Sequence, residues 1–91
     1  MKNVLIINYD LVYPRQNHER LLQKIKAYPH WAYLGGSAYL ILTESTVGQV
    51  CDSLAVALDK GDKLYVGASP APSAFIGMPE EVAKWIHGNQ R

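Results

Sequence analysis

Hydrophobic and polar positions change their period several times along the chain, and each period predicts a different element. The first apolar run, residues 4–9, is rich in β-branched side chains, which favours a strand. Leu5 and Ile7 fall on one face of this strand and Val4 and Ile6 on the other, so both faces are apolar. Such a pattern is typical of a central strand in a sheet that is covered on both sides.

Two segments repeat their apolar residues at the spacing of an amphipathic helix. The first follows a loop over residues 10–16, and we expect Asn17 to be its N-cap and Pro29 to stop it. The second begins with Thr46 and Gln49, which have the spacing of a capping box. Its apolar stripe consists of Val47, Val50, Cys51, Leu54 and Leu58.

Three further strands and one helix complete the predicted elements. Apolar, aromatic runs at residues 31–34 and 37–43 flank two glycines, which is the pattern of a β-hairpin with a tight turn. Residues 63–67 form the fourth predicted strand. A last helix is expected over residues 79–87, because it begins with a proline, which is favoured in a first turn.

The order strand, helix, strand, strand, helix, strand, followed by a C-terminal helix, matches the ferredoxin-like plan with one helix added. We therefore predict an α+β fold in which a four-stranded antiparallel sheet carries both main helices on one face. A single domain is expected over residues 1–91, with its core in residues 1–68. Because the first strand is apolar on both faces, the C-terminal helix, a second subunit or both must cover the other face. The predicted interior places Leu22, Ile25, Val50 and Leu54 against Leu5 or Ile7 and Ile41.

Composition narrows the function classes. Of the 91 residues, 48% are hydrophobic and 19% charged, which is typical of a globular chain. A chain this short buries a small hydrophobic core, and self-association would enlarge the buried apolar surface. Nine Lys and Arg residues against eight Asp and Glu residues give a formal charge of +1, which argues against a large electrostatic footprint on nucleic acid. The single cysteine, Cys51, excludes an internal disulfide and a multi-cysteine metal cluster. The apolar runs are far shorter than the ~20 residues of a membrane span, so we expect no membrane partner and a cytoplasmic location.

An ordered set of short motifs resembles a known small family. The set consists of Ile7-Asn8-Tyr9-Asp10-Leu11 with Pro14, Trp31, Leu34, Ser37, Tyr39, Thr43, Leu58-Asp59, Asp62-Lys63-Leu64-Tyr65-Val66, Ala74-Phe75-Ile76-Gly77 and Trp85-Ile86. With it, the whole chain resembles the short bacterial and phage proteins labelled SinR-like. These are similar in turn to the small ribonuclease-type subunit of CRISPR spacer acquisition and, more distantly, to the virulence-associated protein D toxins. In the CRISPR-type relatives the first strand ends in an Asp, so the resemblance implies that Asp10 lies near a dimer axis and shares a divalent metal with its copy.

Two physical interpretations of Asp10 stand beside this resemblance. Two such carboxylates across a two-fold axis would repel each other and favour Mg²⁺, which could activate water for phosphodiester hydrolysis. Alternatively, Asp10 caps the loop after the strand by accepting hydrogen bonds from the backbone of Val12 or Tyr13. In the same loop, Tyr13 and Arg15 are candidate nucleic-acid contacts, through stacking and phosphate pairing.

The remaining polar and aromatic residues are expected to have structural roles. The histidines show no metal-ligand spacing and are expected at the surface or in helix caps; they are His18, His30 and His87. Trp31, Tyr33 and Tyr39 could form a base-stacking platform, but basic residues do not interleave with them along the chain, which favours core or interface packing.

Two functions are consistent with these observations. The first is a homodimer without a cofactor that binds protein or nucleic acid in a defence, toxin–antitoxin or phage-related system. The alternative is a Mg²⁺-dependent endonuclease of the CRISPR-subunit type that uses Asp10 from each subunit.

Overall fold

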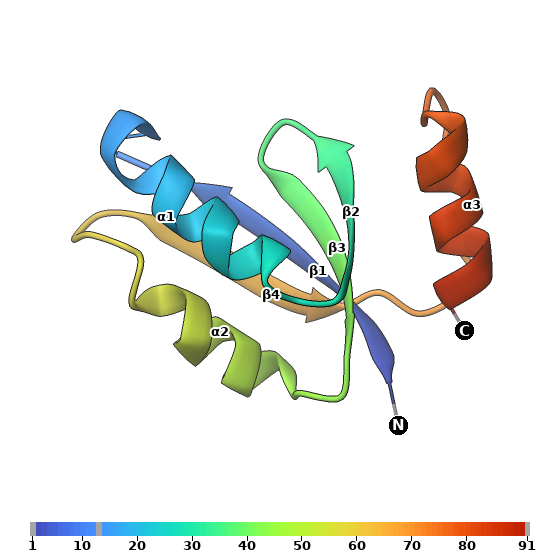
Figure 1. The fold of residues 1–91 in the computed structure, drawn as a ribbon, viewed down its shortest axis with the longest axis horizontal. Helices are drawn as coiled ribbons and strands as arrows, with labels where there is room; N and C mark the ends of the chain where they lie inside the picture. Colours follow the sequence, from blue (N-terminus) through green and yellow to red (C-terminus); the bar gives the residue numbers. More distant parts are fainter. Residues whose placement is uncertain (1, 13, 91) are drawn as a thin grey trace.

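The computed structural model describes residues 2–12 and 14–90, and of residues 14–17 it describes the backbone alone. The elements in chain order are β1 (Asn3–Asp10), α1 (Pro14–Lys26), β2 (His30–Gly35), β3 (Ala38–Thr43), α2 (Val47–Ala55), β4 (Lys63–Ala68) and α3 (Glu80–Asn89). This order confirms the predicted α+β ferredoxin-like fold with an additional C-terminal helix (Figure 1).

The four strands form one antiparallel sheet in the order β2-β3-β1-β4. β1 lies between β3 and β4, so that Ile7 is opposite Tyr39 on one side and Val66 on the other. Helices α1 and α2 pack on one face of the sheet, which we call the inner face, while α3 stands apart from them beyond β2 (Figure 1). β2 and β4 are the edge strands of this sheet, and this position decides the exposure of their side chains.

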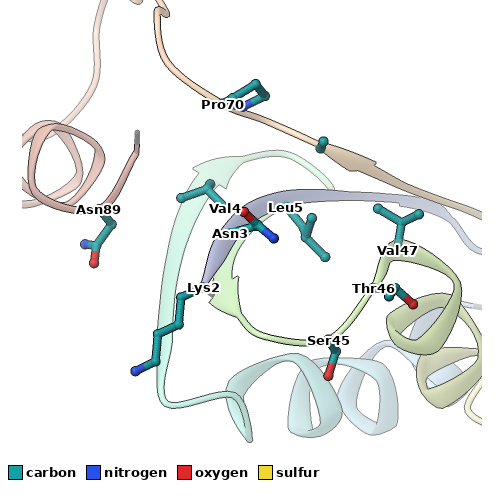
Figure 2. A pocket seen from close by; sticks show the side chains of 10 residues that line it. Lys2, Asn3, Val4, Leu5, Ser45, Thr46, Val47, Pro70 and Asn89 are labelled. Carbon is teal, nitrogen blue, oxygen red and sulfur yellow. The ribbon is translucent and has the colours of Figure 1, made fainter.

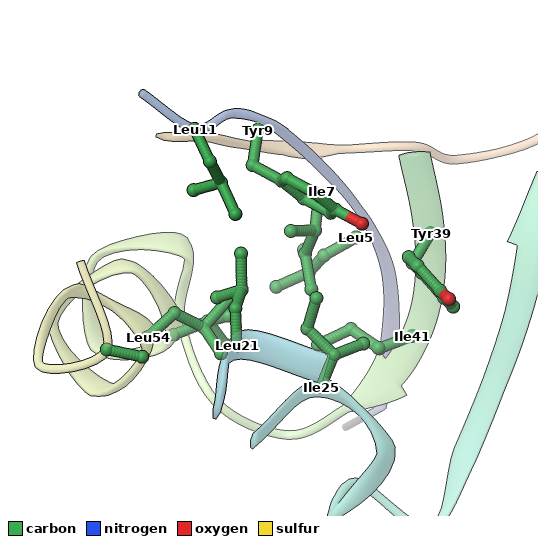
Figure 3. Close-up of a cluster of buried hydrophobic side chains, with 11 residues drawn as sticks. Leu5, Ile7, Tyr9, Leu11, Leu21, Ile25, Tyr39, Ile41 and Leu54 are labelled. Atoms are coloured by element: carbon green, nitrogen blue, oxygen red, sulfur yellow. The ribbon is translucent and has the colours of Figure 1, made fainter. Parts of the chain in front are cut away.

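The inner face carries the larger hydrophobic cluster, which joins the sheet to both main helices (Figure 3). Its buried members are Leu5, Ile7, Tyr9, Leu11, Leu21, Ile25, Tyr39, Ile41, Val50, Leu54 and Ala57. The predicted interior is therefore confirmed, with Leu22 partly buried at its margin. Among the strands, β1 and β3 supply buried members of this cluster. Leu64 and Val66 of the edge strand β4 are partly buried and pack against it.

A second cluster covers part of the outer face. Val82 and Ile86 of α3 are buried against Val4, Ala32 and Leu40 of three strands. Further residues pack partly buried around them, namely Ile6, Leu34, Leu42, Phe75, Met78 and Trp85. The prediction that the C-terminal helix covers the second face is thus confirmed for β2, β3 and the first half of β1.

Several predicted boundaries were wrong. Helix α1 begins at Pro14, so Asn17 lies inside the helix and is not its N-cap. Proline suits a first helical turn, because its φ is already fixed near the helical value and its missing N–H has no partner there in any case. Helix α2 ends at Ala55, so Leu58 packs against the inner cluster from the following turn rather than from the helix. Val47, the first residue of the predicted stripe, is exposed.

The predicted capping box at Thr46 and the predicted hairpin turn were correct. Thr46 accepts a hydrogen bond from the backbone of Gln49, whose side chain in turn accepts one from the backbone of Thr46, so the capping box is complete. In the hairpin turn, Gly35 and Gly36 have φ values of +104° and +57°, a backbone conformation that residues other than glycine rarely adopt.

Candidate functional site

Asp10 ends β1 on the outer face of the sheet. Successive side chains of a strand alternate between the faces, and Val4 and Ile6 of the same strand belong to the outer cluster. Asp10 follows the same alternation and lies opposite Lys63 of β4. Its side chain is exposed, because α3 does not reach this end of β1.

Four side chains of β1 and β4 form a part of the outer face that α3 leaves uncovered, which we call the open patch: Asn8, Asp10, Lys63 and Tyr65. They border a shallow cavity of about 200 Å³. Tyr65 is 64% exposed, and its ring lies over Gly67, where a Cβ atom would come within 2.8 Å of the Tyr65 hydroxyl oxygen. The glycine therefore lets this ring lie along the strand, with one of its faces open to solvent.

The surroundings of Asp10 do not make a metal site within one chain. Within residues 2–12 and 14–90, no group of three or more His, Cys, Asp or Glu side chains is placed to hold a metal ion. The carboxylate is also exposed, so the desolvation cost that would call for a cation is small. The neighbouring cation, Lys63, already offers a favourable cross-strand charge. A Mg²⁺ ion bound at Asp10 would keep most of its coordination sites for water or for groups from outside the chain.

The loop that follows Asp10 is held by a different carboxylate. The Val12 amide donates a hydrogen bond of 2.7 Å to Oδ1 of Asp62, and the Asp59 amide donates one of 2.7 Å to Oδ2. The prediction that Asp10 accepts from the Val12 backbone is therefore wrong. Asp62 lies fifty residues further along the chain, in the turn before β4, and no local spacing could have identified it.

Tyr13 lies outside the described residues, and the same holds for the side chain of Arg15. Their proposed contacts with nucleic acid remain predictions.

A second polar pair lies on the inner side of the same strand end. The Tyr9 hydroxyl oxygen and His18 Nε2 are 2.9 Å apart, and their ring centroids are separated by 5.8 Å. Burial of Tyr9 raises the pKa of its hydroxyl from the ordinary 10.0 to about 12, with smaller contributions from Tyr39 and Tyr33. His18 is exposed at the surface, as predicted, but its hydrogen-bond partner on β1 was not foreseen. The pair borders a cavity of about 250 Å³ beside the hairpin turn.

The three aromatic residues of the hairpin have different surroundings. Tyr39 is 5% exposed and belongs to the inner cluster, which confirms core packing for this residue. Trp31 and Tyr33 flank it, with ring centroids 6.1 Å and 5.0 Å from that of Tyr39, but they are 37% and 46% exposed. For these two residues core packing is thus wrong, while packing at an interface remains a prediction. The side chain of Lys26 also comes to the Trp31 ring, with Nζ 5.0 Å from its centroid, although it is not adjacent in sequence.

Another cavity, of about 210 Å³, lies between the start of β1, the start of α2 and the ends of β4 and α3 (Figure 2). Ser45, Thr46 and Val47 border it at the start of α2. The capping box satisfies the side chain of Thr46 and the amide of Gln49 within the chain.

Comparisons with known proteins do not identify a relative. The chain matches no protein-family model, and no curated protein matches it. Among the helices in the described part of the chain, none is both long and apolar enough to cross a membrane.

Proposed function

We propose that this chain is a non-catalytic binding module that acts as a homodimer and that its two copies meet at the open patch. The supporting observation is Tyr65, a large aromatic side chain that is 64% exposed on the part of the outer face that α3 leaves uncovered. Exposed aromatic surface of this kind is favoured at protein interfaces, where it is removed from water. With the resemblance described above, we assign the module to a defence, toxin–antitoxin or phage-related system and to the cytoplasm.

The charges of the open patch suit contact between two identical surfaces. Asp10 and Lys63 lie opposite each other on neighbouring strands, so the patch carries one anionic and one cationic group. In a two-fold interface each patch meets its own copy. Asp10 of each subunit can then face the partner's Lys63, so that the same ion pair forms on both sides of the axis. Such reciprocal pairing favours the correct alignment of the two copies more than it increases their affinity.

The experiment is to measure the molar mass of the purified protein by size-exclusion chromatography with light scattering. We expect a dimer, and we expect Tyr65→Ala to weaken it by about 30-fold, the effect of removing a central interface tyrosine. Val56→Ala is the matched control, because Val56 is 70% exposed and lies away from the outer face at the end of α2. A monomer at high micromolar concentration, or equal effects of the two substitutions, would contradict the proposed dimer.

The alternative function, a Mg²⁺-dependent endonuclease, is favoured by one observation. Asp10 belongs to the open patch, so a dimer formed there would bring the two Asp10 carboxylates to the same interface, where Mg²⁺ prefers such oxygen ligands. The test is cleavage of RNA and DNA with and without Mg²⁺ by the protein and by its Asp10→Asn variant. Asp52→Asn, at an exposed position on α2, is the control. Cleavage that survives Asp10→Asn would point to a contaminating nuclease and count against this function.

A further inference from the structure

One surface of the inner side combines exposed rings with a cation. It consists of Trp31 and Tyr33 of β2 and Lys26 of α1, and we call it the aromatic strip. Trp31 and Tyr33 are two residues apart on one strand, so their side chains point to the same face. Because β2 is an edge strand, no further strand lies outside these rings, and both keep a solvent-exposed surface.

The rings of the aromatic strip are held in place before any partner binds. Both pack against the buried ring of Tyr39. The Tyr33 hydroxyl also donates a hydrogen bond of 3.2 Å to the Gly36 carbonyl oxygen in the hairpin turn. Rings that are already ordered lose little further conformational entropy on binding, so more of their contact energy is available for affinity.

The spacing of the rings fits separated bases better than a duplex. Two side chains on the same face of a strand are about 7 Å apart, which is roughly twice the 3.4 Å that separates neighbouring nucleotides along a duplex strand. A single strand can spread its bases to this distance, and each base then presents a flat face to one ring.

A cation lies on the face of one of these rings. Lys26 Nζ is over the Trp31 ring, 5.0 Å from its centroid. A base that stacks on Trp31 would displace the ammonium group from the ring face, and Lys26 could then pair with the phosphate of that base.

From this geometry we propose that the aromatic strip binds single-stranded nucleic acid, with bases on Trp31 and Tyr33 and a phosphate at Lys26. This inference rests on the binding module proposed above and names its partner. Single-stranded nucleic acid makes use of stacking rings and a cation together, which is the combination that the aromatic strip offers.

The experiment measures the binding of fluorescently labelled oligouridylate, oligothymidylate and a duplex of equal length to the full chain by fluorescence anisotropy. We expect both single strands to bind more tightly than the duplex. Trp31→Ala and Tyr33→Ala should each weaken binding by about 5-fold to 100-fold, the range for loss of one stacking ring. Trp31→Phe, which keeps a ring and protects the fold, should restore most of the affinity.

A salt titration tests the role of the cation. Lys26→Gln should reduce the slope of log affinity against log salt concentration by about 0.7, which corresponds to one phosphate contact of a single strand. Lys84→Gln removes the same charge from an exposed position on α3 and should leave the slope unchanged. Equal slopes for the two variants would overturn the assignment of Lys26.

The two proposals can fail separately. Tyr65→Ala should dissociate the dimer while each protomer keeps its aromatic strip, so the affinity per protomer should change less than about twofold. The inference would be overturned if the dimer bound none of the oligonucleotides, or if Trp31→Ala and Tyr33→Ala left the binding unchanged. The proposed dimer would not be contradicted by either result. Loss of the dimer in Trp31→Ala would show that a second copy occupies the strip, and would also overturn the inference.

Discussion

The carboxylate of Asp62 connects two loops at the end of the sheet where Asp10 lies, and its removal is a sharp test of the structure. Oδ1 accepts from the Val12 amide in the β1–α1 loop, and Oδ2 accepts from the Asp59 amide in the α2–β4 loop, each at 2.7 Å. Asp62→Asn keeps the size of the side chain but replaces one oxygen with an NH₂ group. Because an NH₂ group cannot accept from a backbone amide, one of the two hydrogen bonds must be lost.

The size of the effect follows from the charge and the exposure of these bonds. A hydrogen bond to a charged group contributes about 1.5–3 kcal/mol, and the lower end applies here because both bonds are accessible to water. We therefore expect Asp62→Asn to reduce the free energy of unfolding by about 1.5 kcal/mol. In a domain of this size that corresponds to a decrease in Tm of roughly 6–12 °C.

Urea denaturation followed by circular dichroism measures this loss, and amide hydrogen exchange locates it. Exchange should accelerate at Val12 or Asp59, whichever amide loses its acceptor. Asp10→Asn is the matched control: it removes the same charge at an exposed position, and its effect should stay within about 0.5 kcal/mol. If Asp10→Asn destabilised the protein as much as Asp62→Asn, the assignment of the loop contact to Asp62 would be wrong.

Three further predictions concern the core, a helix cap and the response to alkaline pH. Leu54→Ala should reduce the free energy of unfolding by about 2–5 kcal/mol in urea denaturation, because Leu54 is fully buried between α2 and the sheet; an effect near zero would contradict that packing. Thr46→Ala should cost about 0.5–2 kcal/mol in the same assay through loss of the capping box, and an unchanged stability would mean that the cap is not formed in solution. The stability of the wild type should fall as the pH rises from 10 towards 12, because unfolded Tyr9 releases its proton near pH 10 and folded Tyr9 only at about 12. This contribution, at most about 2.7 kcal/mol, is fully present below pH 10 and should be absent from Tyr9→Phe; parallel stability curves for the two proteins across this range would refute it.

The elements and their order could be predicted because their signals are local. The two-sided apolar pattern of β1, the capping box at Thr46 and the glycine pair in the hairpin each depend on a few neighbouring residues. The start of α1 was predicted four residues late, because Pro14 and Asn17 both carry signals of a helix start and local pattern does not rank them.

The candidate site was predicted only in part. Asp10 was correctly placed at the end of the first strand, but its exposure depends on how far α3 extends across the outer face. The contact between Val12 and Asp62 joins residues fifty positions apart, and the contact between Tyr9 and His18 depends on the path of the loop between β1 and α1. Neither contact has a spacing that a sequence pattern could reveal.

By itself, the sequence determined the element order, the four-stranded ferredoxin-like plan and part of the inner cluster, because periodicity and turn chemistry are properties of short segments. Only the tertiary structure decided which aromatic side chains face solvent. Tyr33 and Tyr39 belong to one hairpin and are the same residue type, yet one is 46% exposed and the other 5%. The reason is strand order: β3 lies inside the sheet beneath the helices, whereas β2 forms its edge, and strand order is set by pairing between segments that are distant in the chain.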